Sequence, residues 1–110
     1  MKLPGGESAV VDLTKLTNYC LAERHPRGKH KARVFSAALG LKAENAELLR
    51  TALLHAATTE NAVTVASDQF GQRYVIDFEM IGPGGTGIVR STWILRAGEN
   101  APRLTSCYLL

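Results

Sequence analysis

Arg73-Tyr74-Val75-Ile76-Asp77-Phe78-Glu79-Met80 is the stretch on which the fold depends, because its side chains alternate in character. The even-numbered residues are large and apolar, and three of the four odd-numbered residues are charged. A period of two is typical of a strand in an antiparallel sheet with one buried face and one open face. The stretch therefore predicts a half-buried strand with the even-numbered side chains toward the core.

Three further strands are expected around this one. The sequence Gly82-Pro83-Gly84-Gly85-Thr86-Gly87 is interpreted as a turn, because a phosphate-binding loop needs Gly-Lys-Ser/Thr leading into a helix. A strand follows here instead, over residues 89–96, with Val89, Ser91, Trp93 and Leu95 on one side. A final strand is expected over residues 103–108. A short strand at 63–65, with a turn at 68–71, completes a predicted four-stranded antiparallel sheet within residues 62–110.

Before Asn61 the apolar residues recur with the period of a helix. Three helices are expected within residues 12–58, over about 12–22, 29–39 and 43–58, after an entry segment at 1–11 with a short strand at 9–11. Asp12 or Thr14 can cap the first helix, and Gly40 can end the second. Helices followed by strands predict an α+β fold, with three N-terminal helices packed on one face of the four-stranded antiparallel sheet. The 110 residues suffice for a single domain, 1–110.

The composition, 45% hydrophobic and 21% charged, is that of an ordinary globular domain. No apolar run approaches the roughly 20 residues that span a bilayer, and the polar start of the chain does not resemble a signal peptide. Cys20 and Cys107 each lie in an apolar setting, so we expect buried free thiols, which suit a reducing cytoplasm. With two cysteines and no His/Cys ligand spacing, a structural zinc site is not expected. No other metal and no cofactor is expected either.

A second stretch, Arg24-His25-Pro26-Arg27-Gly28-Lys29-His30-Lys31-Ala32-Arg33, is called the basic stretch below. It holds five Lys or Arg, two His and no acid, whereas the other hundred residues hold eight basic and ten acidic residues. Such a local excess indicates a surface for a polyanion; the alternative is a solvated loop that leads into a helix. Lys31 points into the apolar arc of its helix. It either snorkels to water or faces a cleft between helix and sheet.

The open face of the predicted sheet also carries cationic and hydroxyl side chains. If the basic stretch lies at its rim, the two form a groove for phosphodiesters, since Arg binds phosphate bidentately. Metal-dependent nucleases need clustered carboxylates, and here only Asp77 and Glu79 are close. Metal-free RNA cleavage needs a base for the 2′-hydroxyl, an acid for the leaving oxygen, and cations. The residues of the open face are Arg73, Asp77, Arg90, Thr92, Arg96, Arg103 and Thr105.

The basic stretch, with Val34-Phe35 and Ala38-Leu39-Gly40 after it, resembles a bacterial family described as a domain of unknown function, with the signature His-Pro-x-Gly-x-His-Lys-Ala-Arg-x-Phe. The order of helices and strands is also similar to that of the barnase–EndoU–colicin–RelE superfamily. Members of that superfamily are small metal-independent ribonucleases, often toxins with a cognate immunity protein or antitoxin. The family resemblance extends to Leu3-Pro4-Gly5-Gly6, Gly71-Gln72-Arg73-Tyr74, Thr92-Trp93-Ile94 and Pro102-Arg103-Leu104-Thr105.

The superfamily likeness implies that a His, Lys or Arg of the helical part acts together with Thr, Ser, Arg or Tyr of the sheet. By residue type, Lys31 and His30 would share proton transfer, Arg33 and Arg73 would hold the phosphate, and Thr105 would orient it. The expected catalytic residues are therefore His30, Lys31, Arg33, Arg73 and Thr105. The expected phosphate-binding residues are His25, Arg27, Lys29, Arg90, Thr92 and Arg103.

The sequence thus predicts a metal-independent ribonuclease of bacterial toxin type that cleaves RNA, such as tRNA, through the 2′-hydroxyl. Its expected partner is an acidic immunity protein or antitoxin, and no membrane is involved. It would act in the cytoplasm, either its own or that of a target cell into which a toxin domain is delivered. The alternatives are a non-catalytic module that binds nucleic acid or an acidic partner, and an adaptor that contacts only proteins. Beginning with Met1, the chain could be a free-standing toxin, an excised domain or a harmless relative.

Overall fold

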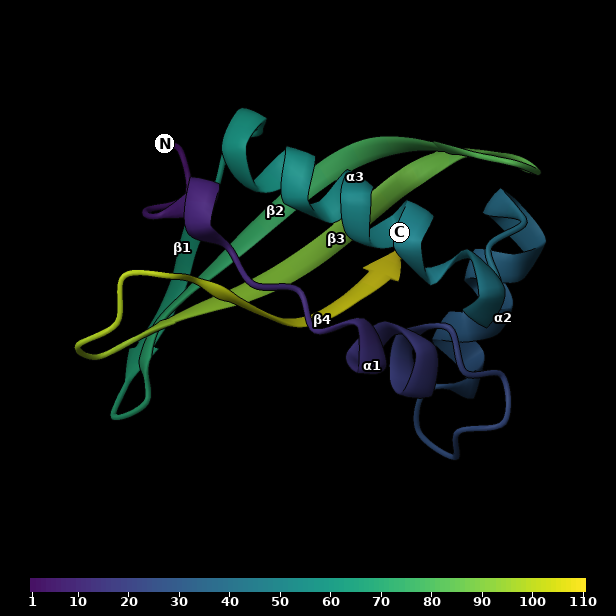
Figure 1. Ribbon diagram of the computed structural model, residues 1–110, viewed down its shortest axis with the longest axis horizontal. Coiled ribbons are helices and arrows are strands. Elements are labelled where there is room, and N and C mark those ends of the chain that lie inside the picture. Colours follow the sequence, from purple (N-terminus) through teal and green to yellow (C-terminus); the bar gives the residue numbers. More distant parts are fainter.

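The computed structural model describes residues 1–110 and has the predicted order of helices followed by strands (Figure 1). The strands form one antiparallel sheet in the order β1-β2-β3-β4, so the predicted α+β fold is confirmed. No helix has the length and apolar character needed to cross a membrane. The helical elements are η1 (Gly6–Ser8), α1 (Leu13–Lys15), η2 (Leu16–Cys20), α2 (Lys29–Leu39), η3 (Ala43–Asn45) and α3 (Ala46–Thr59), and the strands are β1 (Val63–Asp68), β2 (Gly71–Gly82), β3 (Gly85–Arg96) and β4 (Arg103–Leu109).

The face of the sheet that packs on the helices is the one the alternation predicts. All four even-numbered side chains from 74 to 80 of β2 are buried, and they pair in register with Trp93, Ser91, Val89 and Gly87 of β3. Helix α3 crosses this face in Figure 1 and buries Leu49 and Leu53 completely. Fully burying a side chain of this size contributes about 1.5–3 kcal/mol, so this layer accounts for much of the stability.

Ser91 is a polar residue within this core, and its hydrogen bonds are complete. Its Oγ donates to the carbonyl oxygen of Ile76 at 2.8 Å and accepts from the indole Nε1 of Trp93 at 2.9 Å. A buried indole N–H without a partner would be unfavourable, so a serine two residues before Trp93 on the same face satisfies it.

Helix α2 spans the predicted residues and ends where predicted. Gly40 has a left-handed φ of 69°, and a Cβ built there would lie 2.9 Å from the amide nitrogen of Gly84. The amide of Gly84 donates to the carbonyl oxygen of Leu39 at 2.9 Å. Gly82 pairs with Gly85 across the turn, so the glycine-rich stretch closes the β2–β3 hairpin, as predicted, and it also packs on the end of α2.

Two predictions for the N-terminal region were wrong in detail. The helix predicted over 12–22 is a short α1 followed by the π-helical η2, in which the amide of Leu21 bonds the carbonyl of Leu16 at 2.8 Å. Residues 9–11 form no strand, only a parallel bridge between Val10 and Arg103, because the chain turns into α1 immediately afterwards. This bridge places the segment from Val10 to Cys20 along the outer edge of β4 (Figure 1).

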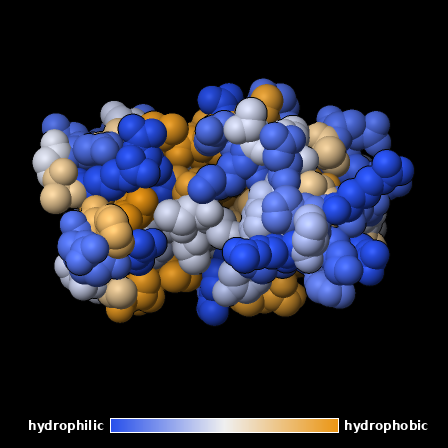
Figure 2. All heavy atoms as spheres, turned by 90° about the horizontal axis from the view of Figure 1, so that it is seen from below, coloured by the Kyte–Doolittle hydropathy of each residue, from blue (hydrophilic) through white to orange (hydrophobic).

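Polar and apolar surface are unevenly distributed. In Figure 2 hydrophilic residues cover the end of the molecule where Figure 1 places α2, and hydrophobic residues are visible toward the middle and the opposite end. Strand β1 adds exposed apolar side chains to the molecule, since all six of its residues are exposed, including Val63 and Val65. The hydrophilic end contains the basic stretch and adjoins the edge of β4.

Candidate functional site

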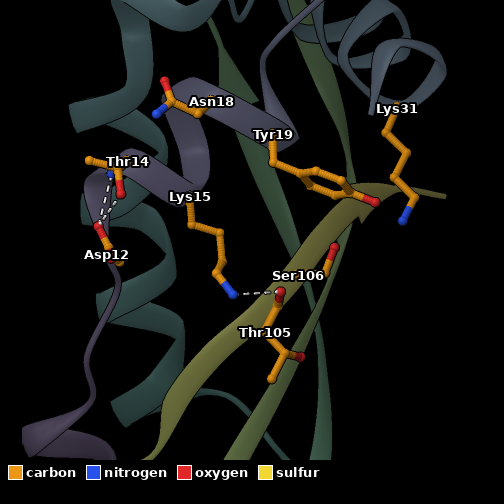
Figure 3. Close-up of a pocket in the computed structure, with 8 residues that line it drawn as sticks. All are labelled: Asp12, Thr14, Lys15, Asn18, Tyr19, Lys31, Thr105 and Ser106. Carbon is orange, nitrogen blue, oxygen red and sulfur yellow. Dashed lines mark hydrogen bonds between the residues drawn. The ribbon is translucent and has the colours of Figure 1, made fainter. Parts of the chain in front are cut away.

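A cavity of about 510 Å³ lies at the edge of β4, between this strand, the α1–η2 segment and the start of α2. We call it the edge cavity. Figure 3 shows the side chains of Lys15 and Lys31 directed toward β4, with the ring of Tyr19 between them. The lining is polar apart from that ring, so the cavity suits a charged or strongly polar ligand. It consists of Asp12, Thr14, Lys15, Asn18, Tyr19, Lys31, Thr105 and Ser106.

The two lysines of the edge cavity have no carboxylate within ion-pair distance. Lys31 Nζ lies 4.9 Å from the ring centroid of Tyr108 and 5.9 Å from that of Tyr19, where the ring faces attract a cation. Lys15 Nζ donates to the carbonyl oxygen of Thr105 at 3.3 Å. Lys31 therefore does not snorkel to water; its side chain faces a cleft between helix and sheet, which is the second of the two predicted alternatives.

Asp12 begins α1 and supplies the carboxylate of the cavity. Its Oδ1 accepts from the Thr14 hydroxyl at 2.7 Å and from the Thr14 amide at 3.0 Å, which confirms Asp12 as a helix cap. These two hydrogen bonds, the hydroxyl's first, lower the pKa of Asp12. The carboxylate is therefore ionised at neutral pH, and its second oxygen has no hydrogen-bond partner in the protein.

The basic stretch folds back onto η2, and this brings Lys31 to the cavity. A Cβ built on Gly28 would lie 2.4 Å from the carbonyl oxygen of Tyr19, so only glycine allows the approach. His25 Nδ1 accepts from the amides of Arg27 at 3.0 Å and Gly28 at 3.1 Å, and its ring packs edge-on against Tyr19 at 4.8 Å. His25 thus holds the loop in place from outside the cavity lining.

Cys20 and Cys107 lie behind the edge cavity and are buried free thiols, as predicted. A hydrogen bond with Cys107 lowers the pKa of the Cys20 thiol to about 7. The same hydrogen bond, and then burial, raise the pKa of Cys107. Tyr19 and Ser106 are their chain neighbours, so the buried thiols lie directly behind two residues of the cavity lining.

Ser106 contributes a buried hydroxyl oxygen that has no hydrogen-bond partner within the protein. An unpaired buried hydroxyl is unfavourable by about 1–3 kcal/mol, and native proteins contain few of them. Its position in the cavity wall is that of a group able to bind a polar ligand atom.

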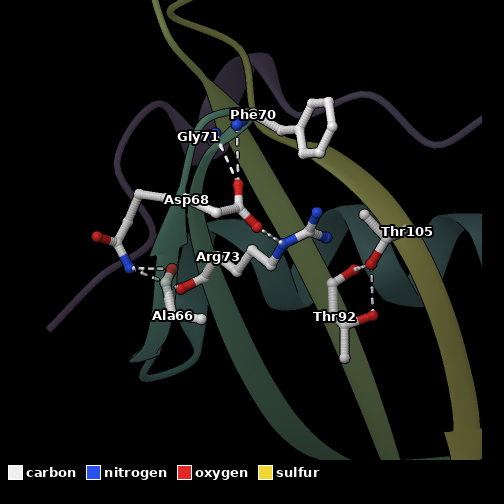
Figure 4. Close-up of polar contacts among 8 residues, drawn as sticks. Ala66, Asp68, Phe70, Gly71, Arg73, Thr92 and Thr105 are labelled. Atoms are coloured by element: carbon white, nitrogen blue, oxygen red, sulfur yellow. Dashed lines mark hydrogen bonds and ion pairs between the residues drawn. The ribbon is translucent and has the colours of Figure 1, made fainter.

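A second cavity, of about 390 Å³, lies on the open face of the sheet and shares Thr105 with the first. We call it the face cavity; Phe70, Arg73, Ile94, Arg96 and Thr105 line it. Arg73 Nε donates to Asp68 Oδ2 at 3.2 Å, which leaves the two terminal nitrogens of the guanidinium group without a partner in the protein (Figure 4). Thr92 on the neighbouring strand β3 fixes Thr105. The two hydroxyl oxygens lie 2.6 Å apart, and the Thr105 hydroxyl is 3.1 Å from the carbonyl oxygen of Thr92, to which it can donate.

The arginines of the sheet are all engaged with carboxylates. Arg90 binds Asp77 through two nitrogens at 2.8 and 2.9 Å; this lowers the pKa of Asp77 and raises the pKa of Arg90 further. Arg103 and Arg96 approach Glu99 at 3.3 and 3.9 Å. No cation of the basic stretch has such a partner, so the free positive charge lies on the helical side.

The structure brings only some of the predicted site residues together. Lys31 and Thr105 meet in the edge cavity, and Arg73 joins Thr105 in the face cavity. The remaining residues line neither cavity: Arg27, His30 and Arg33 are exposed, Lys29 and His25 are half-buried, Arg90 and Arg103 are ion-paired, and Thr92 lies beside Thr105.

Four residues of the edge cavity that carry acid–base or hydrogen-bonding groups were not predicted as site residues: Asp12, Lys15, Tyr19 and Ser106. Lys15 and Tyr19 are four residues apart, a spacing that places side chains on one side of a helix, and this was the available signal. Asp12 was recognised only as a cap, and Ser106 had no signal of its own. No three His, Cys, Asp or Glu side chains lie close enough together to hold a metal ion.

Comparison with known proteins gives a fold relative and a family. No curated protein matches the sequence. A chain of a contact-dependent growth inhibition toxin–immunity protein complex from Klebsiella pneumoniae 342 is structurally similar, with a TM-score of 0.72 over 93% of this chain and 100% of that chain. At 19% sequence identity this likeness concerns the fold. The family model described as Domain of unknown function (DUF6883) matches residues 2–110, and the chain therefore belongs to the DUF6883 family.

Proposed function

We propose that this domain is a metal-independent ribonuclease of toxin type, which cleaves RNA by attack of the 2′-hydroxyl on the adjacent phosphorus. The observation that carries the proposal is the edge cavity, where Lys31 and Thr105, 74 positions apart in the chain, line one polar space with Lys15 and Tyr19. Two ammonium groups without carboxylate partners suit the doubly charged phosphorane of the transition state. The fold shared with a chain of a toxin–immunity complex agrees with a place in such a system, and the unpaired cations of the edge cavity favour the toxin over the immunity protein.

In the proposed reaction the Asp12 carboxylate accepts the 2′-hydroxyl proton, and the 2′-oxygen forms a bond to phosphorus. The bond between phosphorus and the 5′-oxygen breaks, and Lys31 donates a proton to this leaving oxygen. The products are a 2′,3′-cyclic phosphate and a 5′-hydroxyl end. Lys15 and the Ser106 hydroxyl would bind the non-bridging oxygens, and Thr105 would orient the phosphate.

The exposed residues of the basic stretch receive a different role in this proposal. His30 and Arg33 lie outside the cavity lining, so we assign them, with Arg27, to phosphates on either side of the one that reacts. Contacts of this kind position a strand and make binding depend on salt.

The test is incubation of the protein with tRNA and total RNA in EDTA, followed by analysis of the fragment ends. We expect 2′,3′-cyclic phosphate ends, and a loss of about 100-fold or more in rate for Lys31→Gln. Lys29→Gln, on the same helix but outside the cavity, is the matched control and should stay within a few-fold of the wild type. Asp12→Asn should lose a similar factor while it keeps the helix cap, since Asn caps helices as well as Asp does.

His30→Gln separates this mechanism from the one predicted from residue type. If His30 transfers the proton, His30→Gln will lower the cleavage rate as much as Lys31→Gln does. The assignment of proton transfer to Lys31 and Asp12 is then wrong. The fluorescence of buried Trp93 reports whether each variant is folded. Intact RNA at high protein concentration, together with salt-sensitive binding, would favour the non-catalytic binding module instead.

The proposed partner is an acidic immunity protein that covers the edge cavity and the basic stretch. The support is the charge distribution, since five cations of the basic stretch and Lys15 have no carboxylate partner of their own. A partner that supplies carboxylates there would compete with RNA. In this proposal the domain acts in the cytoplasm of a target cell.

A further inference from the structure

Phe70 exposes an aromatic ring at the tip of the β1–β2 hairpin. Its exposed fraction is 60%, whereas the other two phenylalanines and the tryptophan are between 0% and 6% exposed. The turn that carries it is fixed, because Asp68 Oδ1 accepts from the amides of Phe70 at 2.9 Å and Gly71 at 3.3 Å. The hydrogen bond from the Phe70 amide, then Arg73, and last the Gly71 amide lower the pKa of Asp68. The ring is therefore held in the solvent by a defined turn.

The ring borders the face cavity rather than an isolated stretch of surface. Figure 4 shows the Phe70 ring and the Arg73 guanidinium group directed toward the side of the sheet where Thr105 lies. Ile94 contributes the floor; it is only 6% exposed, and Arg73 and Arg103 flank it in register on the neighbouring strands. An apolar floor, an aromatic wall and guanidinium groups at the rim are thus combined in one space.

We infer that the face cavity binds a nucleobase of single-stranded RNA, stacked on Phe70, next to the nucleotide whose phosphate enters the edge cavity. The inference rests on the proposed function for its substrate class. Thr105 lines both cavities, so the two sites adjoin at this residue, as neighbouring nucleotides of one strand require. Surfaces that bind single strands combine exposed aromatic rings for the bases with cations for the backbone, and the free terminal nitrogens of Arg73 supply the second element here.

The test uses a fluorescent single-stranded 2′-deoxy oligonucleotide, which has no 2′-hydroxyl and cannot be cleaved by the proposed route. We expect Phe70→Ala to weaken its binding by about 5- to 100-fold in an anisotropy titration, the effect of removing one stacked base. Phe70→Trp should retain the affinity, and its added indole should change fluorescence on binding. Phe70→Leu should bind nearly as weakly as Phe70→Ala, since it keeps apolar area without an aromatic face.

A matched control is Ile81→Ala, which removes a side chain that is 74% exposed at the other end of β2 and should leave binding unchanged. A series of oligonucleotides with one abasic site each supplies a second measurement. Wild-type protein should lose affinity for one position of the site, and Phe70→Ala should be insensitive to it. Equal binding by wild type and Phe70→Ala, or a flat abasic series, would overturn the inference.

Failure of the inference and failure of the proposed function give different results. RNA cleavage by the wild type with Phe70-independent binding would overturn only the base site. Phe70-dependent binding without RNA cleavage would overturn only the ribonuclease. A wild type that binds no oligonucleotide at low salt would overturn both, and would leave Phe70 as a contact for a protein.

Discussion

The polar groups under the helices differ from those at the edge of β4 in whether they have partners. Ser91, in the core, has both a donor and an acceptor partner, whereas the buried oxygen of Ser106, at the edge, has neither. The cations repeat this contrast, because Arg90 is held by Asp77 while Lys31 has only aromatic rings beside it. Hydrogen bonds and ion pairs that are complete within the protein serve the fold, and groups left incomplete are available to a ligand.

Arg73 lies between these two classes. Asp68 holds its Nε, and its terminal nitrogens are free, so it is oriented by the protein and still able to bind. Four arginines on or beside the open face therefore do not amount to four phosphate ligands. The number of partners of each cation is more informative than the number of cations.

The largest effect is expected for the core serine. Ser91→Ala leaves the Trp93 indole N–H and the Ile76 carbonyl without their partner, and should lower the free energy of unfolding by about 1–3 kcal/mol. Ser106→Ala removes an oxygen that has no partner, so stability should stay unchanged or rise slightly, while RNA binding weakens. Urea denaturation followed by Trp93 fluorescence measures the first quantity. Equal destabilisation by both variants would break the contrast between the two serines.

The next effect concerns the salt dependence of oligonucleotide binding. The double variant Lys15→Gln/Lys31→Gln should flatten the slope of log affinity against log salt by about 0.7 for each phosphate that the variant no longer binds. Arg90→Gln/Arg103→Gln removes the same formal charge from the sheet and should leave the slope nearly unchanged. A similar flattening in both double variants would show that ion-paired arginines bind phosphate as well as free lysines do.

The smallest effect is a change in acid stability. Because the Arg90 hydrogen bonds lower the pKa of Asp77 in the folded protein, this pair stabilises the fold above the ordinary Asp pKa of about 4. The contribution is lost as the pH falls through the lowered folded-state value. Asp77→Asn should therefore be slightly less stable at neutral pH and lose less on acidification, when urea midpoints are compared across the acid range. Parallel pH profiles for the two proteins would contradict an ionic role for Asp77.

Local sequence was sufficient for most of the fold. The bounds of α2 follow from the glycines at 28 and 40, and the buried face of β2 follows from its alternation. The π-helical η2 could not be predicted from local sequence, because it accompanies the burial of Cys20 in a core to which the distant β4 contributes, and the close packing of Gly28 on Tyr19.

The site was less accessible to sequence reasoning than the fold. Lys31 and Thr105 were expected in one cleft and lie in one, since charge and residue type singled them out. Lys15 was not predicted, because its partner is the backbone oxygen of a residue 90 positions away. Every residue type has a carbonyl oxygen, so the sequence does not indicate such a contact. His30 stands beside Lys31 in the chain but lines no cavity, since adjacent residues on a helix point about 100° apart.

Strand β4 supplies the floor of the edge cavity, while its walls come from residues 12–31. Ribosomal synthesis runs from the N-terminus, so the walls emerge long before the floor. Until β4 has emerged and docked, a nascent chain surrounded by ribosomal RNA and tRNA thus has only the walls of the cavity. The order of the elements along the chain would therefore delay completion of the proposed nuclease site until β4 has docked.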